Sequence, residues 1–210
     1  MVSFSNIRKE TARVLGTRHV SVNPHLPFLD IQGLKKPVEI CERINALHAL
    51  VGLTGVEGLR LKKWLLEANT WRHLSLGEQA LFEKSELDTE TMNRLSWMQE
   101  SVYVLCWAGN LVPDINGPES ESDMSDIYPQ IPPASDFQDL LVSFRLRSEA
   151  EICQKLDIYY CLHASTRHPE LWQEPVDLEN VKIAAVLERR HALEWLCGGS
   201  DEWDEVSLDT

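Results

Sequence analysis

The stretch that decides the fold is residues 88–108, which read DTETMNRLSWMQESVYVLCWA. Leu95, Met98, Val102 and Leu105 follow one another at intervals of three and four residues, the spacing of one face of an α-helix. From Val102 onward the other faces are apolar as well, and a helix that is hydrophobic all round usually lies in the centre of a protein. The pattern therefore predicts a long central helix over this stretch.

Helical signals also flank this stretch on both sides. Three Ser/Thr-x-x-Glu sequences, beginning at Thr54, Ser75 and Ser148, have the spacing of a capping box, in which the two side chains close the first turn of a helix. Apolar residues recur with helical periodicity after each of them. Together the signals predict further helices over about residues 5–15, 37–51, from Thr54 to about 68, 75–84, 135–147, 148–163 and 177–196.

These elements predict a mainly α fold: a single-domain helical bundle of about seven to eight helices over residues 1–210. Strand is expected only as short pieces in residues 17–35 or near the C-terminal tail. Residues 113–133 interrupt the helical pattern with five prolines and several acidic residues. We expect an acidic, Pro-rich loop there, and a loop of this length is either functional or disordered.

The composition excludes several classes of protein. Of the 210 residues, 43% are hydrophobic and 25% are charged, which excludes a wholly disordered or collagen-like chain. No apolar run reaches about 18 residues, so we expect no membrane span, and the charged N-terminus lacks the apolar core of a signal peptide. The five cysteines form no CxxC pair, and we expect them to be buried, reduced thiols of a cytoplasmic protein: Cys41, Cys106, Cys153, Cys161 and Cys197.

The net charge of −13 belongs to the second half of the chain. Residues 1–105 carry 13 basic and 12 acidic side chains, whereas residues 106–210 carry 7 basic and 21 acidic ones, a balance of −14. Phosphate repels such a surface, so we expect no nucleic-acid partner. Complementary charge favours a basic protein partner, and solubility is the alternative explanation of the same acidity.

Glu188 and His191 have a Glu-x-x-His spacing that places a carboxylate and an imidazole on one face of a helix. Di-iron bundles use two such motifs and two further glutamates, and this sequence contains one motif. The sequence also lacks a Gly-rich phosphate loop, a dinucleotide-binding motif and a Gly-x-Ser-x-Gly motif. We therefore expect no cofactor, no bound iron or zinc, and no enzymatic activity. An enzyme or metal protein that uses Glu188 and His191 stays open as an alternative.

Four arginines stand on predicted helices: Arg8, Arg43, Arg189 and Arg190. The carboxylates near them in the sequence are Glu39, Glu42, Glu188 and Glu194. Two interpretations stay open: surface ion pairs within each helix, or a network of inward-pointing arginines that ties helices together. Trp203, in the acidic tail, is expected to fold back onto the protein, since an indole left in water forgoes roughly 1.5–3 kcal/mol of burial energy.

The end of the chain also carries a resemblance. VLERRHALEWL (residues 186–196), followed by WDEV (residues 203–206) and a final Asp-Thr, resembles the closing signature of the bacterial domain-of-unknown-function family numbered 4272. Further segments agree: the helix around Arg8, Glu39-x-x-x-Arg43, residues 97–101, 105–108 and 112–114, and the helix over residues 150–163. Cys106 and Asn110 depart from the alanine and glycine expected there. The resemblance implies a single, soluble, mostly helical bacterial domain, and it implies no catalytic residue.

Three classes of function fit these observations: a protein-binding inhibitor, a structural or regulatory interaction domain, and an enzyme. We expect the first, in the form of an immunity protein that neutralises a secreted bacterial toxin by direct binding through its acidic half. The expected partner-binding residues are the acids of the loop and tail and the aromatic residues beside them: Asp114, Glu119, Glu121, Asp123, Asp126, Tyr128, Trp172, Asp201, Glu202, Trp203, Asp204 and Glu205.

Overall fold

The computed structural model of the chain describes residues 3–115, 117–118, 120–168 and 182–209. This part of the chain forms eight α-helices and contains no β-strand, which confirms the mainly α bundle. The helices are α1 (Phe4–Gly16), α2 (Pro37–Gly52), α3 (Gly58–Glu67), α4 (Leu76–Leu81), α5 (Thr89–Ala108), α6 (Phe137–Ser143), α7 (Glu149–Thr166) and α8 (Ile183–Leu196).

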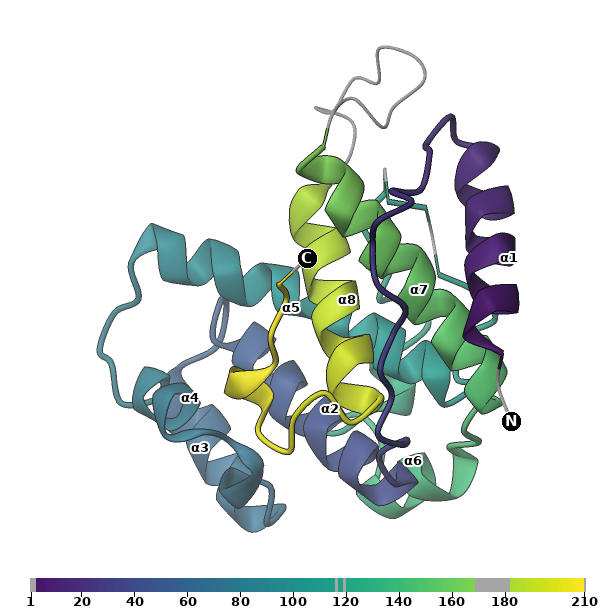
Figure 1. Ribbon diagram of the computed structural model, residues 1–210. Coiled ribbons are helices and arrows are strands. Elements are labelled where there is room, and N and C mark those ends of the chain that lie inside the picture. The colour runs from purple at the N-terminus through teal and green to yellow at the C-terminus, as the bar shows by residue number, and fades with distance from the viewer. Residues whose placement is uncertain (1–2, 116, 119, 169–181, 210) are drawn as a thin grey trace.

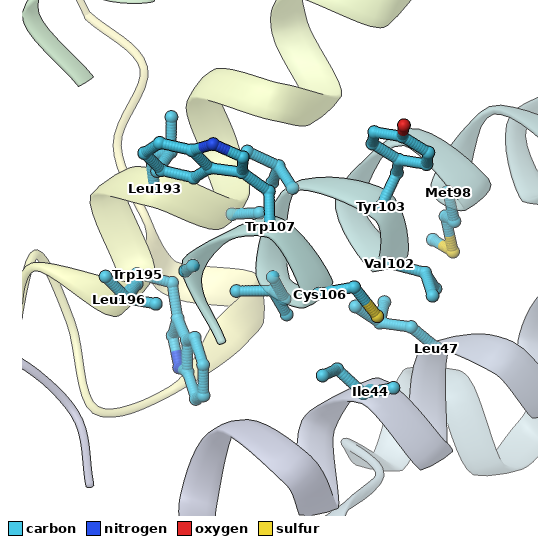
Figure 2. Packing of buried hydrophobic residues seen from close by; sticks show 14 of the residues in the cluster. Ile44, Leu47, Met98, Val102, Tyr103, Cys106, Trp107, Leu193, Trp195 and Leu196 are labelled. Carbon is cyan, nitrogen blue, oxygen red and sulfur yellow. The ribbon is translucent and has the colours of Figure 1, made fainter. Parts of the chain in front are cut away.

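Helix α5 is central, as its apolar sequence predicts. It packs against α2 and α8, and α8 packs in turn against α7, which contacts α1. In Figure 1, α8 crosses in front of α5, with α1 and α7 on one side and α3 and α4 on the other. Side chains of α2, α5 and α8 meet between the helices in Figure 2, where Leu47, Val102, Cys106 and Leu196 are fully buried. None of the helices in the described residues is long and apolar enough to cross a bilayer.

The capping boxes at Ser75 and Ser148 are confirmed, and the one at Thr54 is wrong. Each serine accepts the backbone N–H three residues on, from Glu78 (3.1 Å) and from Glu151 (3.3 Å). The Thr54 hydroxyl instead donates to the Val51 carbonyl (2.8 Å) in the turn that ends α2. Because that turn consumes the threonine, α3 begins four residues later, at Gly58.

The end of α5 is fixed by a close approach of two segments. A Cβ on Gly109 would lie 2.1 Å from the ring of Phe144, so only glycine fits. Asn110 follows with φ of 59°, a conformation that asparagine tolerates better than most residues, and its side-chain amide donates to the Arg145 carbonyl (2.7 Å). Arg145 and Arg147 donate their backbone N–H groups to the end of α5. This pairing explains why α6 ends at Ser143 and not at the expected residue 147.

Residues 113–133, the acidic loop, pack onto the body of the protein in their described part. Ile115, Met124, Ile127 and Ile131 are buried and join the main core. The expected start of the last helix near residue 177 lies outside the described residues, which contain α8 from Ile183. All five cysteines are buried and free, as expected.

Candidate functional site

Arg189, fully buried in α8, anchors the acidic loop. Its guanidinium forms an ion pair with Glu100 of α5 (2.8 Å), and neither side chain is exposed. It also donates to the carbonyls of residues 117 and 120 (3.2 and 2.9 Å) and to the Ser122 hydroxyl (3.2 Å). Glu100 in turn accepts the backbone N–H and the hydroxyl of Ser122 (2.8 and 2.7 Å). One buried ion pair therefore joins α8, α5 and the loop.

Arg190, the next residue, anchors the C-terminal tail. Its guanidinium donates to the carbonyls of Leu208 (3.0 Å) and Asp209 (3.2 Å), and it pairs with Glu194 (3.2 Å). It also contacts Nδ1 of His163. Burial, together with the charge of Arg190, lowers the pKa of His163 to about 4. Consecutive arginines of α8 thus hold two different acidic segments of the chain.

Glu188 and His191 line one cavity of about 490 Å³, together with Arg94, Met98, Leu187, Trp203, Asp204 and Leu208. The Ser101 hydroxyl donates to the Glu188 carboxylate (2.7 Å), and burial raises the pKa of Glu188. His191 packs edge-on against the Trp203 ring, with 4.5 Å between the ring centroids. Burial, aided by the charge of Arg43, lowers the pKa of His191 to about 4, so its imidazole is neutral at pH 7. No group of His, Cys, Asp and Glu side chains in the described residues is suited to hold a metal ion.

A second cavity lies on another side of Trp203. The Trp203 indole is 7% exposed and packs on the Arg43 guanidinium, 4.2 Å from the ring centroid, and on Trp195. Arg43 forms a buried ion pair with Glu78. The cavity has a volume of about 230 Å³ and is lined by Glu39, Glu42, Arg43, Arg72, His73, Leu74, Ser75, Trp195, Asp201, Glu202 and Trp203.

The four arginines singled out in the sequence point inward, which favours the network over surface pairing. Arg8, the least buried of them, bonds Asp157 of α7 (2.9 Å) and the carbonyls of residues 26 and 27. Three of their partners, Glu78, Glu100 and Asp157, lie 35 to 149 residues away along the chain. Helical spacing finds only short-range pairs, so sequence reasoning missed these three and found Glu194 alone.

The predicted partner-binding acids are exposed wherever the structure describes them: Asp114, Glu121, Asp123, Asp126, Asp201, Glu202, Asp204 and Glu205. Asp114 pairs with Lys155 (3.1 Å) and Asp201 with Lys35 (2.7 Å). Tyr128 is 40% exposed and stacks on His48. Trp203 is buried, as its predicted fold-back requires, and so it is not an exposed anchor. Glu119 and Trp172 lie outside the described residues.

The described contacts place the two groups of acids on different elements. Asp114 of the loop lies against α7, through Lys155. Asp201 and Glu202 of the tail instead meet Glu39 and Glu42 of α2 at the smaller cavity. The structure therefore brings together the tail acids and two acids of α2 that are not among the predicted partner-binding residues.

A comparison with known protein families matches most of the chain. The family model described as "Domain of unknown function (DUF4272)" matches residues 8–206. The chain belongs to this family. No curated protein and no solved structure matches the chain. In this DUF4272 protein each residue of the Glu188–His191 run contacts a different segment: Ser101, the acidic loop, the chain end and Trp203.

Proposed function

We propose that this DUF4272 protein is a cytoplasmic binding protein that inhibits a basic protein partner, in the manner of an immunity protein that neutralises a secreted toxin. The observation that carries the proposal is that the apolar and acidic side chains of the acidic loop and tail face opposite ways. Their apolar side chains, such as Ile127 and Ile131, are buried, whereas every described acid of the predicted set is exposed. An acidic surface held on a packed support steers a basic partner and suppresses wrong partners.

The ionisable groups on the inner faces of α2 and α8 support binding over catalysis. Arg43, Arg189 and Arg190 are engaged in internal ion pairs. The Glu188 carboxylate accepts a hydrogen bond from Ser101, and His191 packs on Trp203. The surface carboxylates of the acidic loop and tail are therefore available to a partner.

The test begins with capture of the native partner by the immobilised protein from the cells that produce it. Association rates of the purified pair are then measured at low and high salt, and the partner's activity is assayed with and without the protein. We expect association to be fast at low salt, to slow at high salt, and to abolish the partner's activity. An association rate that does not depend on salt concentration contradicts the proposal. Binding that leaves the partner active favours an interaction domain.

A second candidate is a small-molecule site in the cavity of Glu188 and His191. The observation that favours it is the convergence of a carboxyl group with a raised pKa and a neutral imidazole in a cavity whose volume suits a small ligand. A thermal-shift screen of metabolites tests it. The candidate requires a compound that stabilises the wild type and not Glu188→Gln, with Glu205→Gln as the exposed control.

A further inference from the structure

The smaller cavity beside Trp203, which we call the tail cleft, joins two distant segments of the chain. Glu39 and Glu42 come from the first turns of α2, and Asp201 and Glu202 come from the tail. Residues 72–75 and the indoles of Trp195 and Trp203 complete its wall. At about 230 Å³ the tail cleft is smaller than the roughly 300–1,000 Å³ of small-molecule sites. Its size suits a single side chain.

The charges of the tail cleft favour a cation. Four carboxylates line it against two arginines, and one of these, Arg43, is already paired with Glu78. His73, whose Nε2 lies 3.3 Å from the Glu42 carboxylate, adds no full positive charge, because burial lowers its pKa. Arg72 is the remaining cation of the lining. The lining therefore carries a negative balance.

The lining favours an organic cation over a metal ion. The carboxylates do not form a group that could hold a metal within the described residues. The cleft already carries two internal cations on its indoles: Lys35 lies 5.7 Å from the Trp195 centroid and pairs with Asp201, and Arg43 lies 4.2 Å from that of Trp203. Both follow the same rule, in which a basic side chain lies against an indole and bonds a carboxylate.

One polar atom points to a peptide as the source of the cation. Arg43 is 4% exposed, and its buried Nε has no hydrogen-bond acceptor in the described structure. A buried donor without an acceptor is costly, and a backbone carbonyl would satisfy it. A peptide supplies both a carbonyl and a basic side chain, whereas a free amine supplies only the cation.

We infer that the tail cleft receives one arginine side chain of the protein partner, whose guanidinium binds Glu42 and Glu202. Arginine fits better than lysine because its planar guanidinium bonds two carboxylates at once. This inference rests on the proposed function and adds to it the residue type that the partner presents.

The probe is the blocked tripeptide acetyl-Gly-Arg-Gly-amide, with acetyl-Gly-citrulline-Gly-amide as an uncharged peptide of nearly the same shape. Binding is followed by the indole N–H resonances in a nitrogen–proton NMR correlation spectrum, assigned through Trp195→Phe and Trp203→Phe. We expect the arginine peptide to shift the Trp195 and Trp203 signals saturably, with a millimolar dissociation constant, and the citrulline peptide to leave them unchanged. Equal shifts from both peptides, or none from either, overturn the inference.

Paired variants locate the contact. Glu42→Gln/Glu202→Gln removes two carboxylates of the tail cleft. It spares Glu39, which accepts the backbone N–H of Lys36, and Asp201, which pairs with the Lys35 ammonium. We expect it to weaken arginine-peptide binding by roughly tenfold. The control Glu90→Gln/Asp139→Asn removes the same charge elsewhere on the surface and leaves binding unchanged. Equal weakening by both pairs means that net charge alone attracts the peptide, which contradicts the tail cleft. The proposed function is judged separately, by the salt dependence of partner association.

Discussion

The acidic loop and the acidic tail look alike in sequence and are attached to the protein in different ways. The loop is attached by buried apolar side chains such as Ile127 and Ile131 and by a polar network centred on the Arg189–Glu100 pair, in which both side chains are 0% exposed. The tail is attached by the Trp203 indole and by Arg190, whose partner Glu194 is 19% exposed. The difference teaches that acidic side chains set what a segment shows to solvent, while its inward-facing residues set how firmly it is held.

The largest expected effect comes from the loop's anchor. Arg189→Met leaves Glu100 buried without its counter-charge and removes the donors to the carbonyls of residues 117 and 120. Breaking a buried ion pair by removing one partner costs about 3–5 kcal/mol. We expect the free energy of unfolding, measured by urea denaturation, to fall by about that amount.

Arg190→Met is the matched variant for the tail. Glu194 is partly exposed and keeps access to water, so we expect a smaller loss, about 1–3 kcal/mol. Hydrogen exchange should then separate the two segments, with faster exchange at Ser122 in Arg189→Met and near residues 208–209 in Arg190→Met. Equal losses with uniform exchange would mean that the two arginines form one network.

The aromatic attachment of the tail predicts the next effect. Trp203 is 7% exposed and contacts His191, Trp195 and Arg43. Truncating a buried tryptophan costs about 3 kcal/mol or more, and less where the site is only partly enclosed. We expect Trp203→Ala to lower the melting temperature, and Trp203→Phe to restore part of the loss. An unchanged melting temperature with impaired partner binding would instead assign Trp203 to the interface.

These attachments also mark where sequence reasoning works and where it stops. The helix over residues 88–108 and the caps at Ser75 and Ser148 follow from local spacing, because a helix satisfies its own backbone within a few residues. Glu100 gave no such signal, since its partners, Ser122 and Arg189, lie 22 and 89 residues away. Thr54 carried a local signal that the turn after α2 overrode. The tail cleft likewise depends on α2 and the tail meeting in space.

Two histidines near the tail predict a dependence on pH. The pKa of His163 and of His191 lies at about 4 in the folded protein and near 6.5 when exposed. Between about pH 4 and pH 6.5 these histidines bind more protons in the unfolded chain than in the folded protein. The free energy of unfolding therefore falls as the pH is lowered from about 6.5 to about 4. The raised pKa values of Glu188 and Glu194 act in the opposite direction. We expect the melting temperature to fall over this range.

The double variant His163→Gln/His191→Gln isolates the contribution of the histidines. It removes both titrating groups and leaves the two glutamates in place. Its melting temperature should therefore fall less than that of the wild type between pH 6.5 and pH 4. Parallel curves for the two proteins would show that other groups cause the acid sensitivity.

The smallest effect on stability, and the sharpest comparison of loop with tail, comes from neutralising their exposed acids. Changes at such surface positions usually alter the free energy of unfolding by no more than about 0.5 kcal/mol, so both sets of variants should fold normally.

Charges at the rim of an interface act on the association rate and are screened over about 8 Å at physiological salt. We expect Asn and Gln at loop positions 114, 121, 123 and 126 to slow partner association severalfold at low salt and to leave dissociation unchanged. The same changes at tail positions 201, 202, 204 and 205 should slow association and also speed dissociation, because Asp201 and Glu202 line the tail cleft that holds the partner's arginine. If both sets alter association alone, the tail acts only by its charge, as the loop does, and the tail cleft has no part in the complex.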